Sequence, residues 1–210
     1  MTEFTEWRSL VDGEQIRAIP DDPVFRPDDN DLDKFDGDLG DFDIVESPTM
    51  VEDRSLKFAE TGDATIFSTN EDYEFIKRGY AFEWYYQEEE STALAGPAFG
   101  DSINNFYAVG LGSNDEIRIY KSEDGSVEIE ETVSIDSFDP NQAVIGRVEW
   151  QSDQIFVEAF ATDENLEKDD SLGTATLSDN DYDGPGLGFY RQSGSDTAYL
   201  ERVDVTDILD

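Results

Sequence analysis

A chain of 210 residues with 52 Asp plus Glu, 14 Lys plus Arg and neither His nor Cys carries a formal net charge of −38 at pH 7. Nucleic acid and anionic membranes require a basic patch on a protein partner, and Lys77–Arg78 is the one adjacent basic pair, so we exclude both as partners. The lack of His and Cys likewise excludes Ser–His triads, thiol nucleophiles and the usual zinc sites.

The excess of acidic residues is typical of proteins from high-salt environments. Carboxylates in such numbers repel one another and destabilise the compact state in dilute buffer, and halophilic proteins use this imbalance. At about 1 M salt the Debye length falls to roughly 3 Å, which removes most of the repulsion. Aromatic residues make up 12% of the chain, and apolar residues recur at regular spacing, unlike in disordered acidic chains. We therefore predict a folded protein of a high-salt organism.

Residues 1–27 differ in pattern from the rest of the chain. Their apolar residues do not alternate and are followed by prolines; these residues are Trp7, Leu10, Val11, Ile16, Ile19, Pro20, Pro23 and Pro27. Prolines interrupt regular structure. One interpretation is a flap packed on the chain's own domain. The other is a docking arm, residues 1–24, that binds other proteins or copies of the same chain to form a homo-oligomer.

The beginning of the chain does not match the pattern of a secretory signal peptide. "MTEFTEWRSLVDGEQ" has neither the basic nor the apolar region of a secretory signal. No run of about 18 apolar residues follows it. We expect no signal peptide and no membrane insertion.

Strands are predicted almost everywhere beyond residue 40, because apolar residues recur there with a period of two. "AFEWYYQ" places Phe82, Trp84 and Tyr86 on one face. "EIRIYK", "GRVEWQ" and "QIFVEAF" alternate similarly, and turns rich in Gly, Asn and Asp separate the runs. Roughly a dozen short strands at this spacing predict an all-β fold, a two-sheet antiparallel β-sandwich or jelly roll with a short N-terminal arm.

Outward-facing aromatic residues are candidates for carbohydrate binding, since a ring face can stack on a sugar while its polar tip stays in water. Tyr85 lies opposite the apolar face of its strand, and Arg118 and Tyr120 share the face opposite Ile117 and Ile119. The alternative is that all three candidates are ordinary sheet-surface residues, because cross-strand aromatic pairs stabilise sheets on their own.

The order of motifs resembles a known family. The motifs are "DLDKFDGDLGDFDI", "SLKF", "YAFEWYYQ", "NNFYAVGLG", "IRIYKSEDGSVEIEE", "IGRVEWQSDQIFVEAF" and a closing "GPGLGFYRQSGSDTAYLERVDV". Residues 28–206 resemble a concanavalin A-like lectin/glucanase domain of the laminin G-like kind, which leaves 207–210 as a tail. The resemblance implies a jelly roll that binds sugars or proteins, often holds structural calcium and sometimes hydrolyses glycans. Similar domains occur in proteins of haloarchaea and their viruses.

The resemblance also implies a metal site. Family members commonly carry an Asp at the position of Glu201, which alternation places on the face of Tyr199, Val203 and Val205. An acid on an apolar face needs a partner or a metal. The family's strand order sets the last strand beside the first, which brings Glu201 to the acidic loop, and calcium takes about 6 to 8 oxygen ligands. The candidate ligands are Asp28, Asp31, Asp38 and Glu201. Alternatively, Glu201 pairs with an Arg and the Asp run is solvated.

A second candidate cation site is "DNDYDG". Asp179, Asp181 and Asp183 precede Gly184 at the spacing that opens an EF-hand loop. The twelfth position is Tyr190 and a strand rather than a helix follows, so the loop is no EF-hand. The other interpretation is an acidic hairpin turn.

These observations favour binding over catalysis. Glucanases of the family read Glu-x-Asp-x-x-Glu on the catalytic strand, and neither "VEIEETV" nor "EDYEF" matches, so we expect no enzyme. The first interpretation is a haloarchaeal virion protein, such as a capsid decoration, turret or fibre, that uses its lectin-like domain on the virion surface for host attachment to a cell-surface glycan or glycoprotein. The alternatives are a carbohydrate-binding module in the cytoplasm of a halophilic archaeon and a glycan hydrolase.

The net charge of −38 predicts that the fold depends on salt. Dilution from molar salt toward about 0.1 M lengthens the Debye length from roughly 3 to 10 Å, so carboxylates on neighbouring strands begin to repel one another. A domain stable by about 5–15 kcal/mol can lose its structure to many such repulsions. Circular dichroism across a potassium chloride series at fixed calcium is expected to show the sheet signal falling in dilute buffer. An unchanged signal would contradict the halophilic interpretation.

Overall fold

The computed structural model describes residues 23–27, 31–58, 62–89, 94–112, 115–179, 181–192 and 197–206. Residues 1–22 and 207–210, which make up most of the predicted arm and all of the predicted tail, lie outside this part of the chain. The described residues form an all-β fold whose helical elements are the short 3-10 turns η2 (Asp31–Lys34), η3 (Leu39–Asp41) and η4 (Glu71–Tyr73). None of its helices is long and apolar enough to cross a membrane.

Two antiparallel sheets of seven strands each form the sandwich, which confirms the predicted fold class. The β7 sheet contains, in spatial order, β1 (Asp36–Gly37), β4 (Ala64–Ser68), β13 (Leu187–Arg191), β6 (Ala95–Ser102), β7 (Asn105–Gly112), β8 (Glu116–Glu123) and β9 (Ser126–Ser134). The β5 sheet contains, in spatial order, β12 (Lys168–Leu177), β11 (Ile155–Thr162), β10 (Val144–Trp150), β5 (Ala81–Glu88), β14 (Ala198–Thr206), β3 (Ser55–Phe58) and β2 (Phe42–Val45).

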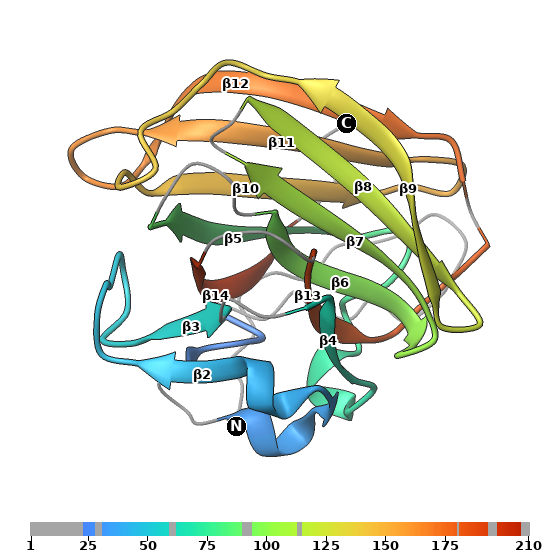
Figure 1. Cartoon of the computed structure of the whole chain (residues 1–210). Helices are drawn as coiled ribbons and strands as arrows, with labels where there is room; N and C mark the ends of the chain where they lie inside the picture. The colour runs from blue at the N-terminus through green and yellow to red at the C-terminus, as the bar shows by residue number, and fades with distance from the viewer. Residues whose placement is uncertain are drawn as a thin grey trace, which may run out of the picture.

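The two sheets meet along one side of the molecule. In Figure 1 strands β6 to β9 run diagonally across the upper strands of the β5 sheet, and the edge strands β9 and β12 lie side by side. The other edge of the β5 sheet, β2, lies at the opposite end with the short turns. This arrangement leaves one broad outer face on each sheet, and both faces are available for polar side chains.

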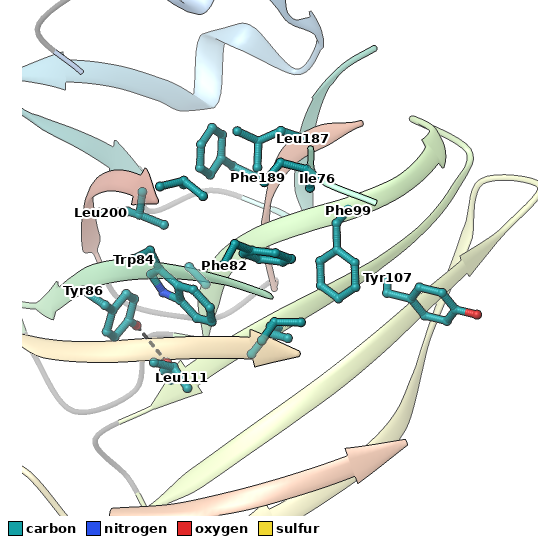
Figure 2. Packing of buried hydrophobic residues seen from close by; sticks show 14 of the residues in the cluster. Ile76, Phe82, Trp84, Tyr86, Phe99, Tyr107, Leu111, Leu187, Phe189 and Leu200 are labelled. Atoms are coloured by element: carbon teal, nitrogen blue, oxygen red, sulfur yellow. Dashed lines mark hydrogen bonds between the residues drawn. The ribbon is translucent and has the colours of Figure 1, made fainter. Parts of the chain in front are cut away.

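Aromatic side chains fill the space between the sheets. As the alternation predicted, Phe82, Trp84 and Tyr86 of β5 are fully buried and point toward the other sheet (Figure 2). The Phe82 and Phe99 ring centroids lie 5.1 Å apart, and the Tyr86 hydroxyl donates to the Leu111 carbonyl at 2.8 Å. Burial of each large apolar side chain is worth about 1.5–3 kcal/mol, so this layer holds the sandwich together.

The core extends into the segment that the sequence assigned to the arm. Phe25 is fully buried, and its ring centroid lies 4.7 Å from that of Phe189. The backbone N–H of Val203 donates to the Phe25 carbonyl at 3.0 Å, and Val24 N–H donates to the Val203 carbonyl at 2.8 Å. Residues 23–27 are therefore part of the sandwich.

A second aromatic layer lies on the outer face of the β7 sheet. Phe67, Phe106, Tyr120 and Tyr190 pack there over strands of small residues, and the Tyr120 and Tyr190 ring centroids are 4.8 Å apart. A Cβ atom at Gly110 would approach the Tyr120 ring to 3.2 Å. The glycine thus lets the ring lie close to β7, and this layer supports the polar residues of β8.

Candidate functional site

The outer face of β8 carries a polar group that we call the Arg118 cluster: Glu116, Arg118, Tyr120 and Gln192. Arg118 donates from Nε and Nη2 to the two carboxylate oxygens of Glu116, at 3.2 and 2.7 Å. Its Nη1 donates to Gln192 Oε1 at 2.7 Å, and the Tyr120 hydroxyl donates to the same oxygen at 2.6 Å. The structure therefore brings together two of the predicted carbohydrate contacts, Arg118 and Tyr120, and adds Glu116 and Gln192.

The ionisation states of the cluster are well defined. Burial alone would lower the pKa of Arg118, but the hydrogen bond and charge of Glu116 outweigh it and raise that pKa. Burial raises the pKa of Tyr120. At neutral pH the cluster thus holds a charged guanidinium and a protonated phenol, and the phenol acts as a donor.

The cluster is accessible at its polar end only. The Arg118 side chain is 21% exposed and Tyr120 is 1% exposed. The neighbours of Arg118 on the adjacent strands are Gly110 of β7, which has no side chain, and Thr132 of β9, which is exposed. Tyr120 is buried and its hydroxyl is bonded to Gln192, so ring stacking on a sugar, which the sequence suggested, does not suit this arrangement.

Tyr85, the third predicted carbohydrate contact, lies on the outer face of the other sheet. It points away from the core as predicted, and its hydroxyl donates to the Leu166 carbonyl at 3.3 Å. Burial raises its pKa. It belongs to a different face of the molecule from the Arg118 cluster and cannot contribute to the same small ligand.

A second polar group, the Lys121 cluster, contains Lys121, Tyr107, Asp179 and Asp181 at one end of the sandwich. Lys121 Nζ donates to Asp179 Oδ2 at 2.7 Å and to the carboxylate of Asp181. The Tyr107 hydroxyl points away from the aromatic core in Figure 2 and donates to Asp179 Oδ1. Two of the three acids predicted as a second cation site thus surround a lysine ammonium.

The charges of the Lys121 cluster support one another. Burial favours a raised pKa for Asp179, but hydrogen bonds from Lys121 and Tyr107 overcome it and lower that pKa. Burial would lower the pKa of Lys121, and the hydrogen bonds to Asp179 and Asp181 instead raise it. Asp183, the third predicted acid, pairs with Arg78 Nη2 at 2.9 Å. The ammonium therefore occupies the position between carboxylates that a cation would take.

Glu201 is fully buried and is held by backbone donors. Its carboxylate accepts N–H bonds from Met50 at 2.6 Å, Val51 at 2.5 Å and Glu52 at 2.8 Å. The Ser55 hydroxyl adds a fourth bond at 2.9 Å. A carboxylate surrounded by N–H donors has its lone pairs directed at hydrogens, so it does not fit the role of a calcium ligand as arranged.

A β-bulge changes the face on which Glu201 lies. The pairing of β14 with β5 shifts between Glu201 and Val203, where Arg202 has a φ of 29°. Glu201 faces outward with Tyr199, whereas Val203 and Val205 face the core, which corrects the expectation of one shared face. An extra residue in one strand reverses the alternation beyond it.

Of the other predicted calcium ligands, Asp38 has a described side chain, and it lies apart from Glu201. β14 lies between β5 and β3, while Asp38 follows β1 in the opposite sheet and accepts a hydrogen bond from Thr65 N–H at 3.1 Å. Asp38 is thus separated from Glu201, whereas Phe25, three residues before Asp28, pairs with Val203 of the last strand. Asp28 and the side chain of Asp31 lie outside the described residues, within which no group of three acids is placed to hold a metal ion. The four-residue calcium set stays a prediction.

Sequence reasoning missed three partners. Glu116 is two residues from Arg118 on the same strand face, so the period of two could have revealed it. Gln192 approaches from the end of β13, and Lys121 meets Asp179 across 58 residues of sequence. No local signal marks such contacts, because they depend on strand order and register.

Comparison with solved structures shows the same fold. The chain is similar to the lumenal domain of VIP36 in its Ca²⁺/Man2-bound form, with a TM-score of 0.54 and 10% identity over 84% of this chain and 82% of that one. It is similar to the GH43 protein BlXynB from Bacillus licheniformis, with a TM-score of 0.52 and 12% identity over 83% of this chain but 37% of that one, so it spans little more than a third of that protein.

The chain is also similar to the binding domain of botulinum neurotoxin DC in complex with SialylT, with a TM-score of 0.50 and 10% identity over 84% of this chain and 43% of that one. No family model and no curated protein matches the sequence. At such identities the likeness shows a two-sheet jelly roll and nothing finer.

The Lys121 cluster predicts a pH-dependent loss of stability in Lys121→Met. Removal of the ammonium leaves two carboxylates unpaired and is expected to lower the free energy of unfolding by about 1–3 kcal/mol at pH 7. The control Lys168→Met, whose partner is Glu83 and whose side chain is 34% exposed, is expected to lose less than about 1 kcal/mol. Urea unfolding in molar potassium chloride measures both.

The sign of the pH dependence follows from the two pKa shifts. Asp179 has a lowered pKa in the folded state, so its stabilisation is present above its unfolded pKa of about 3.9 and is lost as the pH falls through the folded value. Lys121 has a raised pKa, so its stabilisation is present below about 10.4 and is lost as the pH rises further. The difference between wild type and Lys121→Met is expected to be largest between about pH 5 and 9. Equal stability at pH 7 would contradict this assignment.

Glu201→Gln is expected to lower the free energy of unfolding by about 2–3 kcal/mol, because buried N–H donors lose a charged acceptor. The loss should be the same with calcium and with a chelator at constant ionic strength. Glu130→Gln makes the same charge change at an exposed position of β9 and serves as the control. A loss that disappears on chelation would instead place a calcium ion at Glu201.

Proposed function

We propose that this protein is a non-catalytic, lectin-like glycan-binding domain and that the Arg118 cluster is its binding site. The observation that carries the proposal is the state of Arg118. Three of its five N–H groups donate to Glu116 and Gln192, the Tyr120 hydroxyl lies next to the guanidinium, and the side chain remains 21% exposed. A partly exposed guanidinium is suited to the hydroxyl oxygens of a sugar.

The surroundings of Arg118 support ligand binding. The guanidinium is held in one orientation by a bidentate carboxylate, and Tyr120 beneath it is fixed against Tyr190. A donor that is already oriented loses little conformational freedom when a ligand binds. The exposed hydroxyl of Thr132 on the neighbouring strand adds a second polar contact.

The cluster is better suited to binding than to hydrolysis. Glycoside hydrolysis by the usual route requires two carboxyl groups about 5–9.5 Å apart on either side of the scissile bond. The Arg118 cluster contains one carboxylate, Glu116, and both of its oxygens accept from Arg118. The cluster thus lacks the second carboxyl group that this route requires, and the oxygens of the first are engaged by the guanidinium.

The proposal includes a role in a virus particle and a structural calcium ion. The acidic composition and the sequence resemblance support a haloarchaeal virion component that attaches to a host glycan, and mass spectrometry of purified particles should then detect the chain. The VIP36 structures, which are Ca²⁺-bound forms, support structural calcium in the loop that contains Asp28 and Asp31.

Arg118→Ala is expected to weaken glycan binding at least about tenfold, since hydrogen bonds from a charged group contribute about 1.5–3 kcal/mol. A glycan array probed in molar salt identifies a ligand, and isothermal titration calorimetry then compares the variants.

Arg202→Ala is the matched control. Arg202 and Asp204 both lie on β14 of the other sheet, and the guanidinium donates two hydrogen bonds, of 2.7 and 2.9 Å, to the carboxylate. Removal of the Arg202 side chain should leave glycan affinity unchanged. Absence of any bound glycan, or equal affinities of wild type and Arg118→Ala, would contradict the proposed function.

A further inference from the structure

The Arg118 cluster is charge-balanced, and this property bears on the kind of sugar that fits it. The Nε–Nη2 edge of Arg118, which could bind a ligand carboxylate in bidentate fashion, is already occupied by Glu116 at 3.2 and 2.7 Å. An anionic ligand would have to approach a guanidinium whose positive charge is already balanced by Glu116. The two groups are in direct contact, so dissolved salt does not remove this balance.

The neighbouring charges are balanced as well. Asp63 approaches the aromatic layer from the loop before β4 and accepts from the Tyr190 hydroxyl at 3.4 Å. Arg191 lies next to Gln192 in the sequence, and its Nη1 donates to the carbonyl of Gly62, the residue before Asp63. Asp63 thus lies against the aromatic layer beneath the cluster, whereas the Arg191 guanidinium is engaged by the Gly62 carbonyl.

No excess positive charge remains to attract an acid, and the net charge of −38 repels anions further in dilute salt. By contrast, a neutral sugar needs hydroxyl acceptors for the N–H groups of Arg118 and no charge of its own.

Resting on the proposed function, we infer that the site selects neutral glycans and discriminates against sugars that carry a carboxylate, such as uronic and sialic acids. Neutral hydroxyls accept from Arg118 without displacing Glu116. A sugar carboxylate would either compete with Glu116 for the guanidinium or lie beside it, where two like charges repel. Because the balancing contacts are short, this preference is expected to persist in molar salt, where long-range repulsion is screened.

Glu116→Gln separates the two classes of ligand by the sign of its effect. The probes are polymers that carry glucose, galactose or mannose, and the matching polymers that carry glucuronate, galacturonate or mannuronate, titrated in molar potassium chloride. For a neutral sugar, the loss of Glu116 removes the group that orients Arg118, and affinity should fall about tenfold. For the acidic sugar, the same change leaves Arg118 with an uncompensated charge, and affinity should rise.

Controls keep the result interpretable. Asp204→Asn removes the carboxylate of the equivalent Arg202–Asp204 pair on the opposite sheet and should change neither affinity. Glu116→Asp keeps the charge with a shorter side chain, and should bind neutral sugars more weakly than wild type while still preferring them. Circular dichroism confirms that each variant folds.

Three results are decisive. Tighter binding of a neutral polymer than of its acidic counterpart, weakened by Glu116→Gln, supports the inference. Tighter binding of the acidic member by the wild type overturns the inference and leaves glycan binding in place. Binding of no member of either series overturns the proposed function together with the inference.

Discussion

Mutual repulsion of carboxylates is the main physical constraint on how charged residues are arranged on the surface of this protein. With a net charge of −38, its few cations must each serve several acids. Arg118, Lys121, Arg147 and Arg202 all contact carboxylates, and their side chains are 31% exposed or less. Exposed ion pairs contribute about 0–1 kcal/mol, whereas removing one partner of a buried pair costs more because it leaves the other charge without a counter-charge. Lys121 and Arg147, which pair with acids of other segments, therefore link parts of the sandwich as well as supplying counter-charges.

The geometry of a strand explains how the arginines are paired. Residues two apart lie on the same face of a strand, so an Arg and an acid at this spacing meet directly. This pattern occurs at Glu116 and Arg118, where the guanidinium forks onto both oxygens. Arg147 uses the same spacing, but it is buried and also bonds Glu83 at 2.5 Å. Arg118 differs because one of its neighbours is a glycine and its side chain reaches solvent, which supports the proposal of a binding site at Arg118 and not at Arg147.

The aromatic core and the site are connected through β8. Its inward residues Ile117 and Ile119 are fully buried in the sandwich, and its outward residues form the Arg118 cluster. Tyr120 rests on the outer aromatic layer, and its raised pKa keeps the phenol protonated. Strand β8 pairs with β7 on one side and β9 on the other, so the backbone that carries Arg118 is held within the sheet.

The sequence predicts the fold far better than the site. A period of two placed Phe82, Trp84 and Tyr86 in the core, because in a strand local alternation and global burial follow the same rule. The rule fails at Arg202, where a bulge that no residue pattern announces turns Glu201 to the other face. It also fails for contacts set by strand order, and Phe25 shows that prolines in the sequence did not mark the true boundary of the core.

The central claim, that a sugar binds at the outer face of β8, is tested most directly by a crystal structure of the protein with the glycan selected on the array. Sugar hydroxyl oxygens about 3 Å from Nη1 or Nη2 of Arg118, with the bonds to Glu116 intact, are the predicted result. A sugar bound on the outer face of the β5 sheet beside Tyr85, with Arg118 uncontacted, would contradict the account.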